Sequence, residues 1–236
     1  MARSTSNPLD VLPFAIGAIG LGLTGLFFED FALRWQPVPA GTGHRLTLAI
    51  VSGVLLVAGG ALALRKATAA IGAGILAACY GVWVLALHLP VVVAKPGVAS
   101  LLRLCEILAL AAAAAVLCLP RGGTPARIAF GFCAIVFGIS HFAYPGLTAG
   151  MVPQWIPEAM FWAYATGLAH VAAGLALVSG TRAHLAASLL ALMSGGFVLL
   201  IHLPRVMAAP HDHAAWTMFF VSLSIAGAAW VMRGSA

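Results

Sequence analysis

Charged residues are scarce in this sequence. Only 8% of the 236 residues are Asp, Glu, Lys or Arg, and 62% are hydrophobic, whereas soluble domains average about 25% charged and 45 to 50% apolar residues. The mean hydropathy is +1.05. The hydrophobic runs are about 20 residues long and show no period-two alternation, which favours membrane-spanning helices over strands. The composition therefore argues against an ordinary soluble domain and predicts an all-α polytopic membrane protein.

Motifs for several common chemistries are also missing. The four cysteines, Cys79, Cys105, Cys118 and Cys133, fall inside expected spans and form no C-x-x-C pair. No nucleophile stands beside a base, and neither a glycine-rich phosphate loop nor a pair of carboxylates within one span is present. The net charge of +6 comes from Lys and Arg scattered between the spans. These absences argue against a thiol relay, a hydrolase, a kinase and a nucleic-acid-binding protein.

The sequence contains one stretch twice. Residues 52–96 and 166–210 align without a gap at a shift of 114 residues, with 17 identities in 45 positions. The matches include several glycines and prolines and a His-Leu-Pro tripeptide, which begins at His88 in the first copy and at His202 in the second. We therefore expect a duplicated unit.

Eight spans are expected, four in each copy. Because four is an even number, both copies enter the membrane in the same sense, as parallel repeats related by a pseudo-twofold axis along the membrane normal. The first four-helix repeat occupies residues 1–120 and the second residues 121–236. Both termini then lie on one side, and the Lys and Arg residues divide seven to five in favour of that side, which predicts cytoplasmic termini in a cell inner membrane. The expected spans are residues 11–28, 46–64, 69–89, 101–119, 126–144, 160–178, 184–203 and 215–232.

His88 and His202 end the third and seventh spans. The pseudo-twofold axis would place them symmetrically near the outer end of the bundle, where two imidazoles could ligate a haem b iron or a metal ion. A hydrogen bond to a quinone head group is a second interpretation. The third is structural, with each imidazole bonding a backbone carbonyl that is freed where Pro90 or Pro204 stops the helix.

His170 lies about ten residues into the sixth span, near the expected bilayer centre. Ionisable groups at this depth are costly and usually face the interior of the bundle. At the shift of 114 residues its counterpart is Leu56, and His141, near the outer end of the fifth span, is matched by Phe27. A site formed by these two histidines would therefore be asymmetric. An interhelical hydrogen bond and a ligand-binding or proton-handling role are both open for them.

His211 and His213 flank Asp212 in the last outer connection, with Met207 nearby. An H-x-H triplet brings two imidazoles together, and with a thioether close by it suits a borderline or soft metal such as copper. The sequence therefore gives these two histidines as a second candidate metal site.

Two further outer features have a structural interpretation. Arg103 and Glu106 are three residues apart at the start of the fourth span, so they can pair on one helix face. Trp35, together with Trp155, Trp162 and Trp216, is expected in an interfacial aromatic belt.

Three segments of the second copy resemble the DoxX-like membrane proteins. They are residues 138–145 (GISHFAYP), 152–157 (VPQWIP) and 166–177 (TGLAHVAAGLAL). That family consists of small four-helix proteins with a Gly-x-x-His/Lys-Phe turn, a proline-rich loop and a stretch in which many members carry a glutamate where this chain has His170. The family is named after a subunit of a thiosulfate:quinone oxidoreductase, so the resemblance implies a redox or quinone-linked process.

The leading hypothesis is an inner-membrane protein in such a process, with a site near the outer face lined by His88, His141, His170 and His202. A quinone would be its ligand, and a partner redox subunit would supply the electron transfer, since the sequence shows no soluble redox domain. One alternative is a haem- or copper-binding membrane protein that uses the same histidines. The other is a non-catalytic membrane partner or transporter subunit, whose histidines satisfy backbone and interhelical hydrogen bonds.

Overall fold

Eight membrane-spanning helices form an all-α bundle. The computed structural model describes residues 8–119 and 123–235; within them, eight helices are long and apolar enough to cross a membrane, and no strand is present. The chain is therefore a multi-pass membrane protein, as its composition predicts. The expected repeat boundary at residues 120 and 121 lies outside the described residues. The elements are α1 (Pro8–Phe27), η1 (Leu33–Trp35), α2 (Arg45–Ala63), α3 (Ala69–Val82), η2 (Trp83–His88), α4 (Leu89–Ala94), α5 (Val98–Cys118), α6 (Gly123–Ala143), α7 (Pro145–Ala149), α8 (Ala159–Ser179), α9 (Ala183–Phe197), η3 (Val198–His202), α10 (Leu203–Ala208), α11 (His213–Met232) and η4 (Arg233–Ser235).

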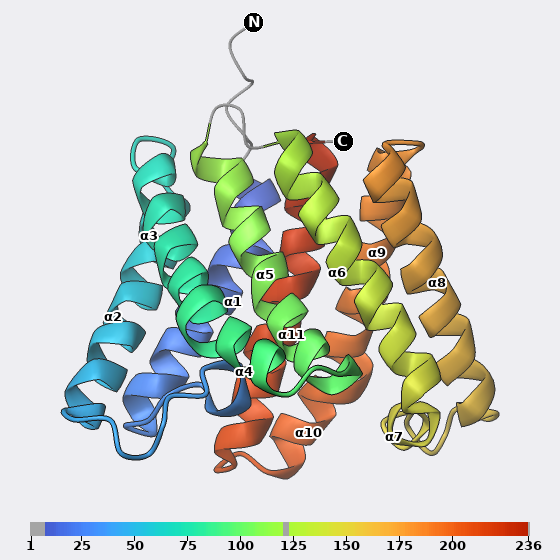
Figure 1. Ribbon diagram of the computed structural model, residues 1–236, viewed down its shortest axis with the longest axis horizontal. Coiled ribbons are helices and arrows are strands. Elements are labelled where there is room, and N and C mark those ends of the chain that lie inside the picture. The colour runs from blue at the N-terminus through green and yellow to red at the C-terminus, as the bar shows by residue number, and fades with distance from the viewer. Residues whose placement is uncertain (1–7, 120–122, 236) are drawn as a thin grey trace, which may run out of the picture.

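The two halves of the chain share one bundle. Helices α1, α5, α6 and α11 stand in the middle, with α2 and α3 on one side and α8 and α9 on the other (Figure 1). Helix α1 packs against α11 as well as α2, and α6 packs against α5 as well as α8. The first long helix of each half thus lies against the last long helix of the other half. The pseudo-twofold axis between two copies stays a prediction, and it would produce packing of this reciprocal kind.

The pattern of buried residues repeats between α2 and α8. Every buried residue of α8 has a buried counterpart in α2 at the shift of 114 residues, and His170 takes the place of Leu56. The other counterparts are Ala49 and Ala163, Gly53 and Gly167, Gly60 and Gly174, and Ala63 and Leu177. The imidazole of His170 therefore occupies a position that is filled by an ordinary apolar side chain in the first half.

Helices α1 and α6 correspond at a different shift. Buried, half-buried and exposed positions agree throughout residues 14–24 and 130–140, which are 116 residues apart rather than 114. A Cβ atom on Gly22 would lie 2.5 Å from the carbonyl oxygen of Gly53, and one on Gly138 would lie 2.5 Å from that of Gly167. The pairing of His141 with Phe27 is therefore wrong, and at this shift the counterpart of His141 is residue 25. Close contact at small residues fixes the helix register here.

Two spans continue through a proline at which the sequence predicted their end. The π-helical turn η2 follows α3, and α4 then runs on through Pro90; η3 and α10 repeat this arrangement around Pro204. A proline lacks the N–H, and its ring collides with the carbonyl four residues earlier in a regular α-helix, so a widened turn at this point lets the helix continue. The resulting spans, Ala69–Ala94 and Ala183–Ala208, have 26 residues each.

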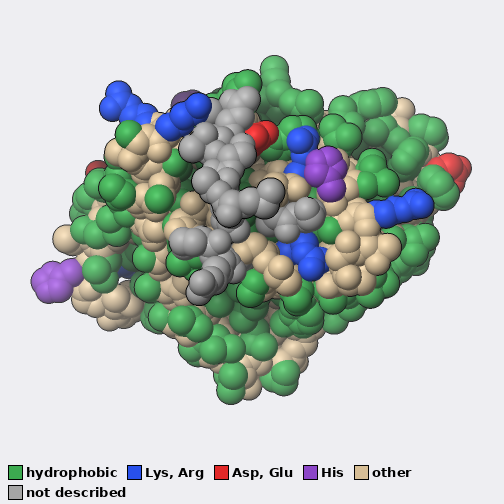
Figure 2. Space-filling view, turned by 90° about the horizontal axis from the view of Figure 1, so that it is seen from above, with side chains coloured by type: hydrophobic (Ala, Val, Ile, Leu, Met, Phe, Trp, Pro, Cys, Tyr) green, Lys and Arg blue, Asp and Glu red, His purple; other side chains and the backbone are tan. Residues whose placement is uncertain are grey.

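The described ends of the chain lie at the same end of the bundle, as eight spans require (Figure 1). Figure 2 looks onto this end and shows Lys and Arg side chains spread among the hydrophobic ones. Helices α4, α7 and α10 lie at the opposite end, which we call the outer end. His141 lies near the end of α6 on this side, whereas His170 lies near the middle of α8.

Candidate functional site

His141 and His170 lie side by side between α6 and α8. The centroids of their rings are 5.2 Å apart, and the ring planes are tilted by 51°. Gly167 makes this approach possible, because a Cβ atom on it would lie 2.7 Å from the Cβ atom of His141. His170 is buried and His141 is half-buried. The structure thus brings together two of the four histidines that the sequence assigns to one site.

Hydrogen bonds to the backbone determine which ring nitrogens carry a proton. Nδ1 of His141 lies 3.0 Å from the carbonyl oxygen of Ala163, and Nδ1 of His170 lies 2.9 Å from that of Thr166. A carbonyl oxygen only accepts hydrogen bonds, so each Nδ1 is the donor. The Thr166 hydroxyl, 3.0 Å from Nδ1 of His141, donates to the carbonyl oxygen of Trp162 and can accept from the same imidazole. Each neutral imidazole then presents an unprotonated Nε2.

The two Nε2 atoms make no hydrogen bond with any residue that the structure describes. Nδ1 of His202 also lacks a partner, but that nitrogen is fully buried, whereas neither of these Nε2 atoms is. A neutral imidazole with a bonded Nδ1–H has a lone pair on Nε2 that can accept a hydrogen bond, take up a proton or ligate a metal. The histidine pair therefore offers two acceptors to a ligand that brings donors.

Aromatic side chains surround the histidine pair. The rings of Phe137 and Phe197 have centroids 6.0 and 6.2 Å from that of His170. Phe142 and Tyr164 stack on each other, and both are exposed on the bundle, where the bilayer would contact them. The site is thus walled by rings on the protein side and flanked by exposed rings, which suits a hydrophobic ligand with a polar head.

In the first half of the chain, a hydrogen-bonded serine and a leucine occupy the positions that correspond to Thr166 and His170. Ser52, the counterpart of Thr166, accepts a hydrogen bond of 2.9 Å from Nε2 of Gln36, and Leu56 fills the place of His170. Thr166 was not among the predicted site residues, although Ser52, its counterpart at the shift of 114 residues, also carries a hydroxyl group. The two halves therefore share a fold but differ in what this position offers to a ligand.

His88 has a different role from the one expected. Its Nε2 lies 2.9 Å from the carbonyl oxygen of Trp35 and donates to it. This carbonyl belongs to η1, not to the helix around Pro90, so the expected bond to a freed helix carbonyl is not formed. The indole of Trp35 is only 3% exposed, and its predicted place in an interfacial belt is wrong for this residue. The segment before α2 folds inward and carries Trp35 with it.

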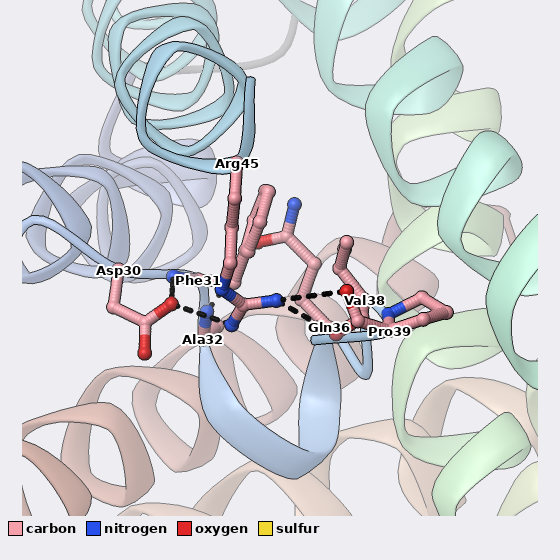
Figure 3. A network of polar contacts seen from close by, with 7 residues as sticks. All are labelled: Asp30, Phe31, Ala32, Gln36, Val38, Pro39 and Arg45. Atoms are coloured by element: carbon pink, nitrogen blue, oxygen red, sulfur yellow. Dashed lines mark hydrogen bonds and ion pairs between the residues drawn. The ribbon is translucent and has the colours of Figure 1, made fainter. Parts of the chain in front are cut away.

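Arg45 holds this segment in place (Figure 3). Its guanidinium lies 2.7 Å from a carboxylate oxygen of Asp30 and donates to the carbonyl oxygens of Val38 and Pro39 at 2.8 and 3.3 Å. The same guanidinium stands 4.9 Å from the centroid of the Phe31 ring. One cation thus ties together both ends of the loop that contains η1.

Replacing Arg45 by glutamine is expected to loosen the loop without unfolding the bundle. The ion pair is partly exposed, so the free energy of unfolding should fall by only about 0.5 to 1 kcal/mol. Amide hydrogen exchange over residues 30–39, followed by mass spectrometry, should rise clearly in this variant and not in Lys95→Gln, which removes an exposed cation at the same end. Unchanged exchange in Arg45→Gln would show that the loop is held by other contacts.

His202 does not join His88. Among the described residues, the two share no hydrogen bond or ring contact, and Nδ1 of His202 is buried without a partner. The bond from His88 to Trp35 occupies its Nε2, which leaves only Nδ1 for the haem or metal ligation that the repeat suggests. The structure therefore gives no symmetric pair of free Nε2 atoms at this position.

His211 and His213 lie beside a pocket between α1 and α11. The ring of His213 stacks on Phe28 with centroids 4.5 Å apart, and His211 lines the pocket, whose volume is about 320 Å³. Within the part of the chain that the structure describes, no group of three His, Cys, Asp or Glu side chains could hold a metal ion. Among the described residues, His211 and His213 therefore have no third His, Cys, Asp or Glu side chain that could complete the predicted metal site.

Comparison with known proteins covers the second half of the chain. A family model described as a domain of unknown function (DUF8561) matches residues 130–233. No curated protein and no solved structure matches the chain. The matched segment includes His141, His170 and His202.

Proposed function

We propose that the chain binds a quinol in the membrane and takes part in a quinone-linked redox process. His141 and His170 accept hydrogen bonds from the hydroxyl groups of the quinol head. One observation carries the proposal: in two neighbouring imidazoles, each Nδ1 is bonded to a backbone carbonyl and each Nε2 is left without a partner among the described residues. The resemblance of this segment to DoxX-like proteins supports the same conclusion.

The reduced form of the ligand fits the histidine pair better than the oxidised form. A quinol brings O–H donors, which neutral Nε2 atoms accept. A quinone brings only carbonyl acceptors, which would face the lone pairs of both imidazoles. The aromatic rings of Phe137 and Phe197 can contact the head group, while the tail extends past Phe142 and Tyr164 into the lipid.

In this role the imidazoles accept protons and the electrons leave the chain. When the quinol is oxidised to the quinone, each of its two hydroxyl protons passes to the Nε2 atom that accepts its hydrogen bond, and the two electrons pass to an electron acceptor on a partner redox subunit. We place the protein in the inner membrane with both termini in the cytoplasm, because Lys and Arg favour the terminal end. The site then opens towards the outer leaflet.

A bound metal ion is the second candidate. Metal-ligating imidazoles commonly donate the other ring N–H to a backbone carbonyl, and both histidines do so here. Two side-chain ligands are fewer than the three or four that zinc or copper sites use. Elemental analysis of the purified protein separates this candidate from the first, since copper or zinc at one per chain, lost in His170→Leu, would favour the metal.

The preference for quinol over quinone tests the proposal. We expect decylubiquinol to bind the protein in lipid nanodiscs, under anaerobic conditions, at least about tenfold more tightly than decylubiquinone, because the quinone offers no donor to either Nε2 atom and each hydrogen bond lost costs about 1 to 3 kcal/mol. Equal affinities, or tighter binding of the quinone, would contradict the acceptor role of the Nε2 atoms. Absence of binding by either form would leave the non-catalytic partner or transporter subunit as the better account.

A further inference from the structure

The pocket between α1 and α11 is open to the lipid at the outer end of the bundle. Its volume is about 320 Å³, and side chains of both helices line it. Leu23 and Phe27, which line it from α1, are 53% and 75% exposed and belong to a membrane-spanning helix. Gly20 lines its deeper end, where the missing side chain lets the ring of Phe220 lie against α1. The bilayer therefore has direct access to the pocket.

Two aromatic pairs form the walls of this pocket. At the end of α1, the rings of Phe27 and Phe28 meet edge to face with centroids 5.0 Å apart. On α11, the rings of Trp216 and Phe220 stack with centroids 5.7 Å apart. The ring of Phe28 also stacks on that of His213, at 4.5 Å. Each wall ring is thus held by another ring, and the walls are preformed apolar surfaces.

The hydrogen-bond donors inside the pocket are already used by the protein. The hydroxyl of Thr24 donates to the carbonyl oxygen of Gly20 at 2.8 Å, and Nε1 of Trp216 donates to that of Pro210 at 2.8 Å. His211 lies in the loop at the outer rim and is exposed, so its imidazole can donate to a phosphate oxygen. The interior of the pocket therefore suits an apolar chain, and its rim suits a polar head group.

The pocket is elongated along the axis of α1. Gly20 and Phe27 both line it and are seven residues apart, which corresponds to about 10 Å along the helix. The hydrocarbon core of a bilayer is about 30 Å thick, so one leaflet contributes about 15 Å. A lipid acyl chain runs in the same direction as the helix, with its head group at the outer end. The shape of the pocket therefore fits an acyl chain.

Carboxylates flank the rim of the pocket. Glu29 and Asp212 each directly follow a residue that lines it, and no Lys or Arg lies within four residues of either in the sequence. Glu29 is exposed and Asp212 is half-buried. The carboxylate of Asp30 is already paired with Arg45 at 2.7 Å. The charges at the rim thus attract a head group that carries a cation and repel an anionic one.

We propose that the pocket between α1 and α11 binds one membrane phospholipid whose head group carries an ammonium, as in phosphatidylethanolamine. One acyl chain lies along the aromatic walls, and a phosphate oxygen accepts a hydrogen bond from His211. The ammonium lies next to the carboxylates of Glu29 and Asp212. The site shares no residue with the histidine pair, so the quinol proposal and this one are tested separately.

Native mass spectrometry of the detergent-purified, delipidated protein tests the proposal. Phosphatidylethanolamine and phosphatidylglycerol with identical acyl chains are titrated separately, and the Kd of the first lipid adduct is measured. We expect the wild type to bind phosphatidylethanolamine about fivefold more tightly than phosphatidylglycerol, because the exposed carboxylates favour the ammonium. Phe27→Ala should weaken the binding of both lipids about fivefold, because it removes part of one apolar wall.

Phe161→Ala is the matched control for the wall of the pocket. Phe161 is 61% exposed in the first turn of α8, and its ring meets that of Trp162 edge to face at 5.4 Å, much as Phe27 meets Phe28. This variant removes an equally exposed ring from the outer end and should bind both lipids like the wild type.

Glu29→Gln tests the choice of head group. It should lower the preference for phosphatidylethanolamine to about twofold, because one of the two carboxylates at the rim is neutralised. Glu158→Gln is its control, since Glu158 is also exposed at the outer end and has a φ of 56°, against 52° for Glu29. This control should keep the full preference.

Three outcomes overturn the proposal. The first is equal affinity of the wild type for the two lipids, and the second is binding by Phe27→Ala that matches binding by Phe161→Ala. The third is a lipid-independent dimer of the wild type that Phe27→Ala dissociates, which would assign this surface to a second copy of the chain.

Discussion

Replacing His170 by leucine is expected to weaken quinol binding by at least about tenfold while the bundle stays folded. The repeat provides the rationale, since Leu56 occupies the same buried position in the first half. Leucine and histidine are of similar size, so the substitution leaves no large cavity. It removes one of the two Nε2 acceptors, and a hydroxyl of the bound quinol then loses its partner, at a cost of about 1 to 3 kcal/mol.

The stability of this variant separates a site from a structural contact. We expect Tm of His170→Leu to equal or exceed that of the wild type, because a buried imidazole is replaced by an apolar group. His184→Leu, which removes an exposed histidine at the other end of the bundle, should change neither binding nor Tm. If His170→Leu binds decylubiquinol as well as the wild type does, the histidine pair is not the quinol site. If it loses the fold, His170 is mainly structural.

Gly227→Ala is expected to give the largest loss of stability from a single methyl group. A Cβ atom on Gly227 would overlap with the backbone nitrogen and Cα of Phe14, so α1 and α11 would have to separate. Overpacking of this kind costs about 1 to 3 kcal/mol, and for a chain of this length about 2 kcal/mol corresponds to a Tm lower by about 4 to 8 °C. The contact joins the first long helix of the chain to the last, so the loss reports on the packing between the halves.

The matched control is Gly195→Ala in α9, where a Cβ atom would meet no atom within 4 Å. Both variants add the same methyl group to a membrane-spanning helix, and only Gly227→Ala should lower Tm in a fluorescence-detected thermal unfolding experiment in detergent. Equal Tm values for the two variants would contradict the close contact between α1 and α11.

Hydrophobic run length and internal repetition account for most of the fold that was predictable. Eight spans follow from composition because the membrane admits few alternatives. The buried positions of α2 and α8 agree at the shift of 114 residues read from the sequence, at which Leu56 corresponds to His170. The ends of the third and seventh spans were predicted wrongly, because both helices continue through a proline. The widened turns before Pro90 and Pro204 that allow this depend on backbone geometry that no residue type specifies.

The composition of the site was harder to predict. The shift of 114 residues that aligns α2 with α8 pairs His141 with Phe27. The burial pattern and the glycine contacts instead align α6 with α1 at a shift of 116 residues. The inward position of Trp35 depends on three bonds from Arg45 that span the loop. Long-range hydrogen bonds of this kind leave no periodic signal in a sequence, and so the bond from His88 to the carbonyl oxygen of Trp35 became visible only in three dimensions.

The two halves of the chain differ in the side chains that they place at this position. In the first half, Gln36 bonds Ser52 and Leu56 fills the core. In the second half, the hydroxyl of Thr166, which corresponds to that of Ser52, lies next to the imidazole of His141 rather than next to a glutamine. His170 stands where the first half has Leu56. A duplicated unit can keep one copy as a scaffold while the other diverges, and here the second copy carries the unpaired acceptors.

Photo-crosslinking with a reduced azidoquinone analogue tests the central claim most directly. The protein in nanodiscs is labelled under anaerobic light exposure, digested and mapped by mass spectrometry. Label is predicted on peptides that contain residues 137–143 of α6 and 160–171 of α8, removed by excess decylubiquinol and absent in His170→Leu. Label that decylubiquinol does not displace, or label concentrated on the pocket around Phe28 and Trp216 between α1 and α11, would contradict a quinol site at His141 and His170.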